Sequence, residues 1–268
     1  MVRLRFFPVA GVFALMAVVT AQVAPAQPAV PNAALLSLGL ESGVSTAKHE
    51  LPGTETGSFE IAQHGHAVGT ASYKFASVPK GVDSTSLVKV AMQGLDYALS
   101  KNEELTATDE LEHVQLSAIV NGEAVTVAAK LDAEQFVLDI SANGRSTSTR
   151  LAAHKAAVFL PDFDAGALQT LLTLAVAHNS RDLWAIVPKQ AGTIEPVQLA
   201  TYADQVGTLD GKQITVHHLV ATIAGANTDL FSGPENQLLQ AELPQQGFAL
   251  VRKGFVLTPP AKPAAPAE

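Results

Sequence analysis

The chain has no cysteine, few aromatic residues and fewer basic than acidic residues. The lack of cysteine excludes disulfides, thiolate zinc sites, catalytic thiols and the lipid-modified cysteine of a bacterial lipoprotein. Aromatic residues make up 6% of the 268 residues, which disfavours a carbohydrate-binding surface built from stacked rings. Lys and Arg number 17 against 25 Asp and Glu, a formal net charge of -8, so nucleic acid is not an expected partner.

Sequence motifs of catalysis are also missing. The chain has no G-x-S-x-G elbow, H-E-x-x-H pair, phosphate-binding glycine loop or calcium loop. The pattern S-x-x-K occurs at Ser45–Lys48, Ser77–Lys80 and Ser86–Lys89, without the other elements of the penicillin-recognising enzymes. Three matches to a two-residue pattern indicate chance. We therefore expect no enzymatic activity, no cofactor and no metal.

The N-terminus carries the most specific signal in the sequence. A basic head with Arg3 and Arg5 precedes the uncharged apolar run Phe6–Val19, and small residues near Ala26 form an A-x-A-like cleavage site. The pattern predicts a cleaved signal peptide over 1–26 and a periplasmic or secreted protein. An uncleaved anchor is the alternative, but the run is short for a membrane span, and we expect no transmembrane segment in the mature chain.

The rest of the chain divides by composition. Residues 27–56 are punctuated by proline and glycine and are expected to form a linker. Residues 259–268 are rich in proline and alanine and are expected to be a disordered tail, because this composition cannot build a core. Between them, 57–258 contains no break long enough to divide it, which predicts one domain.

Within this domain the apolar residues repeat with a period of two. The pattern is clear over 86–93, 114–118, 124–131 and 135–140, where one face is apolar and the other mixed. Asn121-Gly122 and Asn143-Gly144 are dipeptides typical of two-residue hairpin turns. About ten strands are expected in all. The predicted fold is mainly β, a single large curved antiparallel sheet that forms a half-barrel or open barrel.

One segment breaks this period. Residues 164–179 are apolar almost all the way round a helix, with Asp162 or Asp164 able to cap its start and Asn179 suited to its end. A helix so apolar must be buried. We therefore expect one helix packed in the concavity of the sheet.

The order of these segments resembles a known family of exported proteins. The signal peptide, the meander of hairpins, the apolar helix after Pro161, and the closing pair Leu238–Pro244 and Phe248–Arg252 are similar to the LolA-like curved half-barrel periplasmic proteins, lipoprotein carriers and their uncharacterised relatives. The resemblance implies a sheet wrapped round helices with an apolar cavity, which in carriers holds acyl chains. It transfers no individual site residue to this chain.

The histidines and the tryptophan are expected to have structural roles. His64 and His66 flank a glycine near a predicted bend, where we expect an exposed turn and no metal site. His217 and His218 are neighbours in a strand, so they face opposite sides, and the one facing the core needs a hydrogen-bond partner. Trp184 is expected in the core.

These sequence patterns are consistent with two functions. The first is a binding or carrier protein that holds an apolar or amphiphilic ligand, such as a lipid, on the concave face of the sheet. Its expected lining residues are the inward-facing apolar ones: Val88, Val90, Met92, Leu116, Phe136 and Leu138. The alternative is a non-enzymatic structural or interaction protein of the cell envelope, which captures a protein partner through a sheet edge or the proline-rich tail.

Overall fold

The computed structural model describes residues 54–177, 182–189 and 192–259. The predicted signal peptide 1–26, the predicted linker up to residue 53 and the tail from residue 260 lie outside the described residues. The linker expectation was too long by three residues, because the first strand begins at Thr54.

The first eight strands form an antiparallel meander in which each strand pairs with the next. Their bounds are β1 (Thr54–Gln63), β2 (His66–Val78), β3 (Gly81–Met92), β4 (Leu95–Thr106), β5 (Leu111–Val120), β6 (Glu123–Asp132), β7 (Gln135–Ala142) and β8 (Arg145–Ala152). Both predicted Asn-Gly turns are present. Asn121 and Gly122 have φ of 51° and 86°, and Asn143 and Gly144 have φ of 53° and 69°, as a tight hairpin between right-twisted strands requires.

In the described residues, the second half of the chain contains the single helix and nine strands. Their bounds are β9 (Ala156–Phe159), α1 (Ala165–Ala177), β10 (Leu183–Val187), β11 (Thr193–Thr201), β12 (Gln205–Leu209), β13 (Lys212–Ile223), β14 (Ala226–Ser232), β15 (Leu238–Leu243), β16 (Phe248–Arg252) and β17 (Phe255–Leu257). β16 pairs with β1 and so joins the two halves, and the pairing continues through β15, β14 and β13 to β11, β10 and β9. β12 also pairs with β13 and carries β17.

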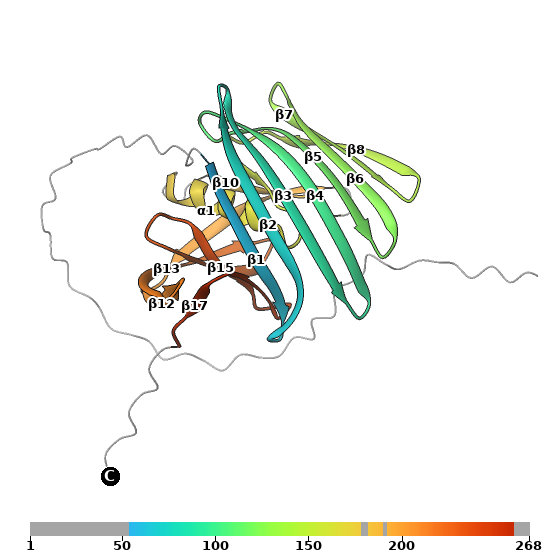
Figure 1. Ribbon diagram of the computed structural model, residues 1–268. Coiled ribbons are helices and arrows are strands. Elements are labelled where there is room, and N and C mark those ends of the chain that lie inside the picture. The colour runs from blue at the N-terminus through green and yellow to red at the C-terminus, as the bar shows by residue number, and fades with distance from the viewer. Residues whose placement is uncertain (1–53, 178–181, 190–191, 260–268) are drawn as a thin grey trace, which may run out of the picture. The chain divides into compact units, whose positions relative to one another are not determined.

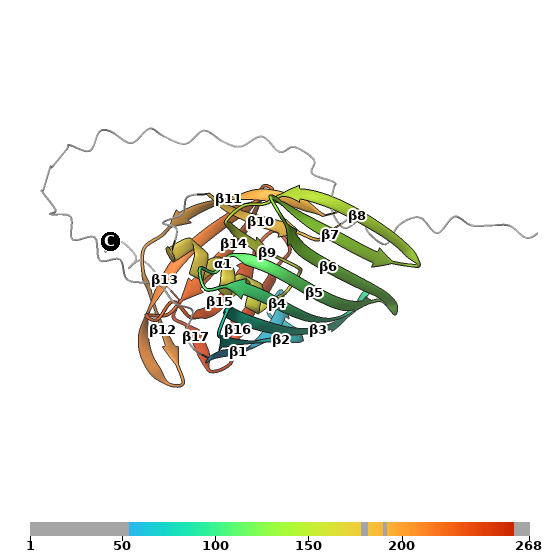
Figure 2. The ribbon, with the colours of Figure 1, turned by 90° about the horizontal axis from the view of Figure 1, so that it is seen from above.

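The result is one sheet of 17 strands that curls round α1 without closing (Figures 1 and 2). Seen from above, α1 lies inside the curl, and the strands of both halves surround it. The helix contacts β1, β2 and β3 of the first half and β15 and β9 of the second. The expected fold class, a mainly β open barrel packed on one buried helix, is confirmed.

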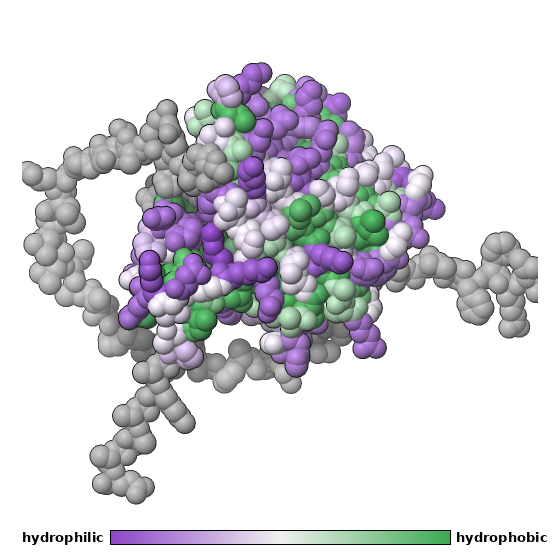
Figure 3. Space-filling view, viewed as in Figure 1, coloured by the Kyte–Doolittle hydropathy of each residue, from purple (hydrophilic) through white to green (hydrophobic). Residues whose placement is uncertain are grey.

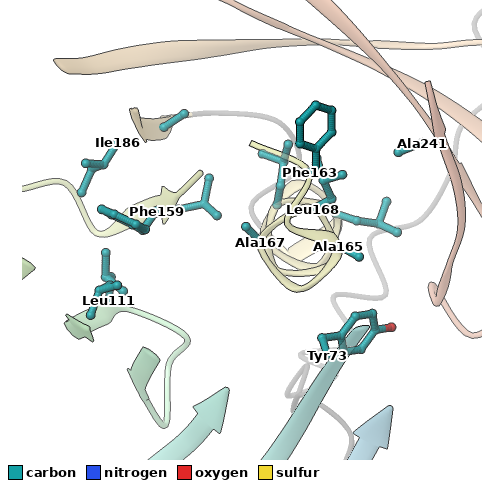
Figure 4. Close-up of a cluster of buried hydrophobic side chains, with 14 of the residues drawn as sticks. Tyr73, Leu111, Phe159, Phe163, Ala165, Ala167, Leu168, Ile186 and Ala241 are labelled. Carbon is teal, nitrogen blue, oxygen red and sulfur yellow. The ribbon is translucent and has the colours of Figure 1, made fainter. Parts of the chain in front are cut away.

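The interior is filled by the helix and by large apolar side chains. In Figure 4, α1 lies between Phe159 and Ile186 on one side and Ala241 on the other, with Tyr73 below it. Leu171, Leu172 and Leu174 of α1 are among the most completely buried side chains of the described residues. Because burial of such side chains is the main favourable term in folding, α1 is the centre of the hydrophobic core.

Three details differ from the sequence prediction. β9 and β10 pair in parallel, so the sheet is mixed, because α1 is the crossover that carries the chain from one to the other. The sheet has 17 strands against about ten expected. The apolar pattern of Phe248–Leu257 predicts one strand, but a turn at Gly254, whose φ is 83°, divides this segment into β16 and β17.

Candidate functional site

The six residues predicted to line a ligand site all face the inside of the barrel. Five of them are buried in the hydrophobic core: Val88, Val90, Leu116, Phe136 and Leu138. Met92, at the end of β3, is partly buried and packs against the same core. The alternation in the sequence therefore identified the inner face correctly, and that face is occupied by the protein's own side chains.

A hollow of about 770 Å³ lies on the opposite, outward face of the same strands. It extends over β1 to β6, and its largest exposed apolar side chains are Leu87 and Ile119, which are 58% and 52% exposed. In Figure 3, which looks onto this face, hydrophobic groups lie among hydrophilic ones. Single exposed apolar side chains are normal on a protein surface, but apolar side chains that gather in one place mark a candidate binding surface.

The pairing register arranges the side chains of this hollow in two rows across the strands. One row is hydroxylic apart from its central Leu87, and consists of Ser58, Ser72, Leu87, Ser100, Ser117 and Thr126. The neighbouring row contains Lys89, Ala98, Ile119 and Ala124. The floor is therefore built from small side chains, which leaves room above the backbone.

The charge in this hollow is positive although the protein is acidic. Among the described residues, Lys89 and Lys253 are the only charged ones that line it. Lys253 lies in the turn after β16, where its backbone N–H donates to the carbonyl of Ser58 at 2.9 Å. A chain of net charge -8 that places two ammonium groups beside an apolar hollow offers a local site for an anion. A smaller hollow on β6 and β7 differs, since Lys130 is accompanied there by Asp132 and Asp139.

A second polar feature is enclosed in the core. Lys101 of β4 places its Nζ 2.9 Å from Oδ2 of Asp164 and 3.0 Å from Oε2 of Glu103, and all three side chains are 0% exposed. Ser84 and Ser86 of β3 pair with Glu103 and Lys101 and lie on the same inward face. The five side chains Ser84, Ser86, Lys101, Glu103 and Asp164, called the buried polar cluster below, thus join two strands to the start of α1.

Asp164 has two roles in the buried polar cluster. Its Oδ1 accepts the backbone N–H groups of Gly166 at 2.9 Å and Ala167 at 3.1 Å, which caps α1 as the sequence predicted. Its Oδ2 faces Lys101. Gly166 is required by this arrangement, because a Cβ at that position would lie 2.3 Å from Oγ of Ser86.

The electrostatics of the buried polar cluster are those of one cation between two carboxyl groups. Burial raises the pKa of Glu103, against the smaller lowering by the Lys101 ammonium. Burial lowers the pKa of Lys101, but the carboxylates of Asp164 and Glu103 raise it, and the net direction is upward. Among the described residues, Oγ of Ser84, Oγ of Ser86 and Oε1 of Glu103 have no hydrogen-bond partner.

Sequence reasoning missed Lys101 and Glu103 because it missed β4. The inward positions of this strand are Leu99, Lys101, Glu103 and Leu105, so two charges interrupt the apolar alternation. The signal was present, since an apolar residue two positions before Lys101 and another two positions after Glu103 place both charges on a buried face. Charged residues at such positions are almost never fully buried unless they are paired.

A further polar network holds α1 against the sheet. Gln169 accepts the backbone N–H of Leu238 at 2.6 Å and donates to the carbonyl of Asn236 at 3.0 Å. The hydroxyl of Tyr73 donates to Glu55 and contacts Gln169 at 3.2 Å. Burial raises the pKa of Glu55, which the hydrogen bond from Tyr73 lowers in part.

The histidines and Trp184 have structural surroundings. His64 and His66 are exposed at the turn between β1 and β2. His217 and His218 face opposite sides as predicted, with His218 held by Asp229 at 2.8 Å and stacked on Phe231. Trp184 packs against the core and stacks on His154. In the described part of the chain, no three His, Cys, Asp or Glu side chains gather as a metal site would require.

The serine–lysine patterns do not form dyads where the structure describes them. Ser86 points into the core and Lys89 points outward, since residues three apart in a strand lie on opposite faces. Ser77 and Lys80 are exposed around the turn between β2 and β3. Ser45 and Lys48 lie outside the described residues.

Comparison with known proteins gives no assignment. No family model, no curated protein and no solved structure matches this chain. The resemblance to LolA-like proteins therefore stays a prediction. Over residues 54–177, 182–189 and 192–259, no helix has the length and apolar character needed to cross a membrane.

Proposed function

We propose that the protein binds an anionic amphiphile, such as a fatty acid, in the hollow on the outward face of β1 to β6. The observation that carries this proposal is the placement of Leu87 and Ile119 in a hollow of about 770 Å³ whose charged lining residues, in the part of the chain that the structure describes, are Lys89 and Lys253. Ligand sites of this size are lined mostly by apolar groups, with a few polar groups that fix orientation.

The apolar and the basic side chains of the hollow have different roles in binding this ligand. An acyl chain lying across the strands covers the exposed surface of Leu87 and Ile119, which supplies the binding free energy. A carboxylate or phosphate at its end pairs with Lys89 or Lys253. The proposal retains a carrier-type function for an exported protein and moves the ligand from the inward face to the outward one.

The test is titration of the purified chain with the fluorescent fatty acid cis-parinaric acid. We expect Leu87→Ser to weaken binding about tenfold or more, because the ligand no longer buries a leucine. Val256→Ser is the matched control, since Val256 is also exposed, at 63%, but lies on β17 away from the hollow.

The charge is tested separately. Lys89→Glu should weaken binding of the acid and leave binding of its uncharged methyl ester unchanged, and the difference should shrink with added salt. Lys74→Glu is the matched control, because Lys74 is exposed on β2 but does not line the hollow. No binding by the unmodified chain, or equal binding by the Leu87→Ser and Val256→Ser variants, would contradict the proposed function.

A further inference from the structure

Lys101, Glu103 and Asp164 have the composition of a bond-forming site. The side-chain amine nitrogen of Lys101, Nζ, lies 2.9 Å from a carboxyl oxygen of Asp164. A second carboxyl group, that of Glu103, contacts the same nitrogen at 3.0 Å. An amine and a carboxylic acid condense to an amide when they are held together and kept from water, and all three side chains are fully buried. We propose that Lys101 and Asp164 form an intramolecular isopeptide bond.

The reaction balances without any other reactant. A bond forms between Nζ of Lys101 and Cγ of Asp164, and the bond between Cγ and Oδ2 breaks. The ammonium carries three protons, of which the amide keeps one and the departing Oδ2 takes two as water. The net change is the loss of one water molecule, with no oxidation or reduction. The ion pair becomes a neutral amide, which removes two buried charges from the core.

Glu103 is placed to move the protons. Its Oε2 contacts Nζ, so its carboxyl group takes a proton from the nitrogen and gives its own proton to Oδ2 as water leaves. Glu103 is in the same state before and after the reaction.

The start of α1 stabilises the intermediate. When Nζ attacks Cγ, negative charge develops on Oδ1 of Asp164. The backbone N–H groups of Gly166 and Ala167 already donate to Oδ1, at 2.9 and 3.1 Å. Two fixed N–H donors at a developing oxyanion are the arrangement that lowers the barrier of acyl transfer.

A second lysine–aspartate pair in the same region serves as an internal control. Nζ of Lys189 lies 2.8 Å from Oδ1 of Asp162, but these side chains are 51% and 43% exposed. This pair is open to water, and no second carboxyl contact to Lys189 is found in the described part of the chain. We expect it to remain an ordinary ion pair.

The test is the intact mass of the full purified chain after denaturation, compared with the mass of its sequence from the N-terminal residue that its terminal peptide shows. We expect a mass lower by one water molecule. Lys101→Arg keeps the charge but supplies no reactive amine, and should have the full mass of its sequence. Lys189→Arg should keep the deficit of one water molecule.

Glu103→Gln separates the proton-transfer role from folding. Glutamine preserves the size and a hydrogen-bonding group, so we expect this variant to fold and to show the full mass or only slow loss of water. A full sequence mass in the unmodified chain would overturn the proposal. A deficit that persists in Lys101→Arg would overturn it too, since it would place the water loss elsewhere, such as a cyclic imide at Asp210-Gly211. None of these outcomes depends on ligand binding in the outward hollow.

Discussion

Asp162 and Asp164 lie two residues apart and each contacts a lysine at nearly the same distance, yet their surroundings are opposite. Nζ of Lys189 lies 2.8 Å from Oδ1 of Asp162, and both side chains are about half exposed to solvent. Nζ of Lys101 lies 2.9 Å from Oδ2 of Asp164, and both side chains are fully buried in the core. The residue between the two aspartates, Phe163, has φ of 60° and is buried against Phe248. This left-handed turn directs one aspartate outward and the other inward. The comparison teaches that burial, and not contact distance, decides what an ion pair does.

The largest effect is expected from breaking the buried pair. Lys101→Met keeps the length of the side chain but removes the nitrogen that neutralises Asp164, whether as an ion pair or through the proposed amide bond, and leaves the carboxyl groups of Asp164 and Glu103 alone in the core. Removing one partner of a buried pair leaves a charge without compensation and costs about 3–5 kcal/mol. Urea unfolding followed by circular dichroism should show a loss of this size. A loss below about 1 kcal/mol would mean that the pair is no more important than a surface one.

A smaller effect is expected from the pH dependence of Glu103. Because burial raises the pKa of this group above its ordinary value of 4.5, the folded state holds a proton that the unfolded state releases. The contribution of this proton to the free energy of unfolding is therefore fully present below the pKa that Glu103 has in the unfolded state. It is lost as the pH rises through the pKa of the folded state.

The matched variant for this prediction is Glu103→Gln. Melting temperatures measured from about pH 5 to about pH 8 should fall more in the unmodified chain than in this variant. Burial also raises the pKa of Glu55, which is present in both chains. The fall of melting temperature with pH that remains in the Glu103→Gln variant is therefore assigned to Glu55. Equal slopes in the two chains would show that Glu103 does not hold a proton in the folded state.

The smallest effect is expected from the exposed pair. Lys189→Ala removes a surface ion pair whose charges are solvated, and such pairs contribute about 0–1 kcal/mol. The same urea titration measures it, and added salt should leave the variant and the unmodified chain equally stable. A loss as large as that of Lys101→Met would remove the distinction between the two pairs.

Much of the fold could be predicted from local patterns. The inward apolar alternation, both Asn-Gly turns and the buried helix follow from short-range rules that the structure obeys. The sequence pattern also predicts strands over 183–187 and 238–243, which are the bounds of β10 and β15. The Asn143-Gly144 turn implied a strand after it, but the extent of β8 could not be predicted because its sequence, Arg145–Ala152, has almost no apolar residues and is mostly exposed on both faces. β4 was not predicted because Lys101 and Glu103 occupy its buried positions.

The candidate sites depend on contacts that no local pattern encodes. Lys101 and Asp164 meet only because α1 lies inside the curl with its first turn against β3 and β4. The hollow around Leu87 and Ile119 arises from the register of five strand pairings, which places small residues around two apolar ones. The sequence prediction placed the ligand on the inward apolar face of the sheet. That face packs against α1 and the rest of the hydrophobic core.

The most direct measurement is the fragment spectrum of a tryptic digest. Asp162 and Asp164 fall in one peptide, 156–181, so fragments that separate them show which carboxyl carries a branch. We expect this peptide to be joined through Asp164 to Lys101, with no cleavage after Lys101 and normal cleavage after Lys189. Linear peptides with complete cleavage after Lys101, or a branch at Asp162, would contradict the claim that burial selects the reactive pair.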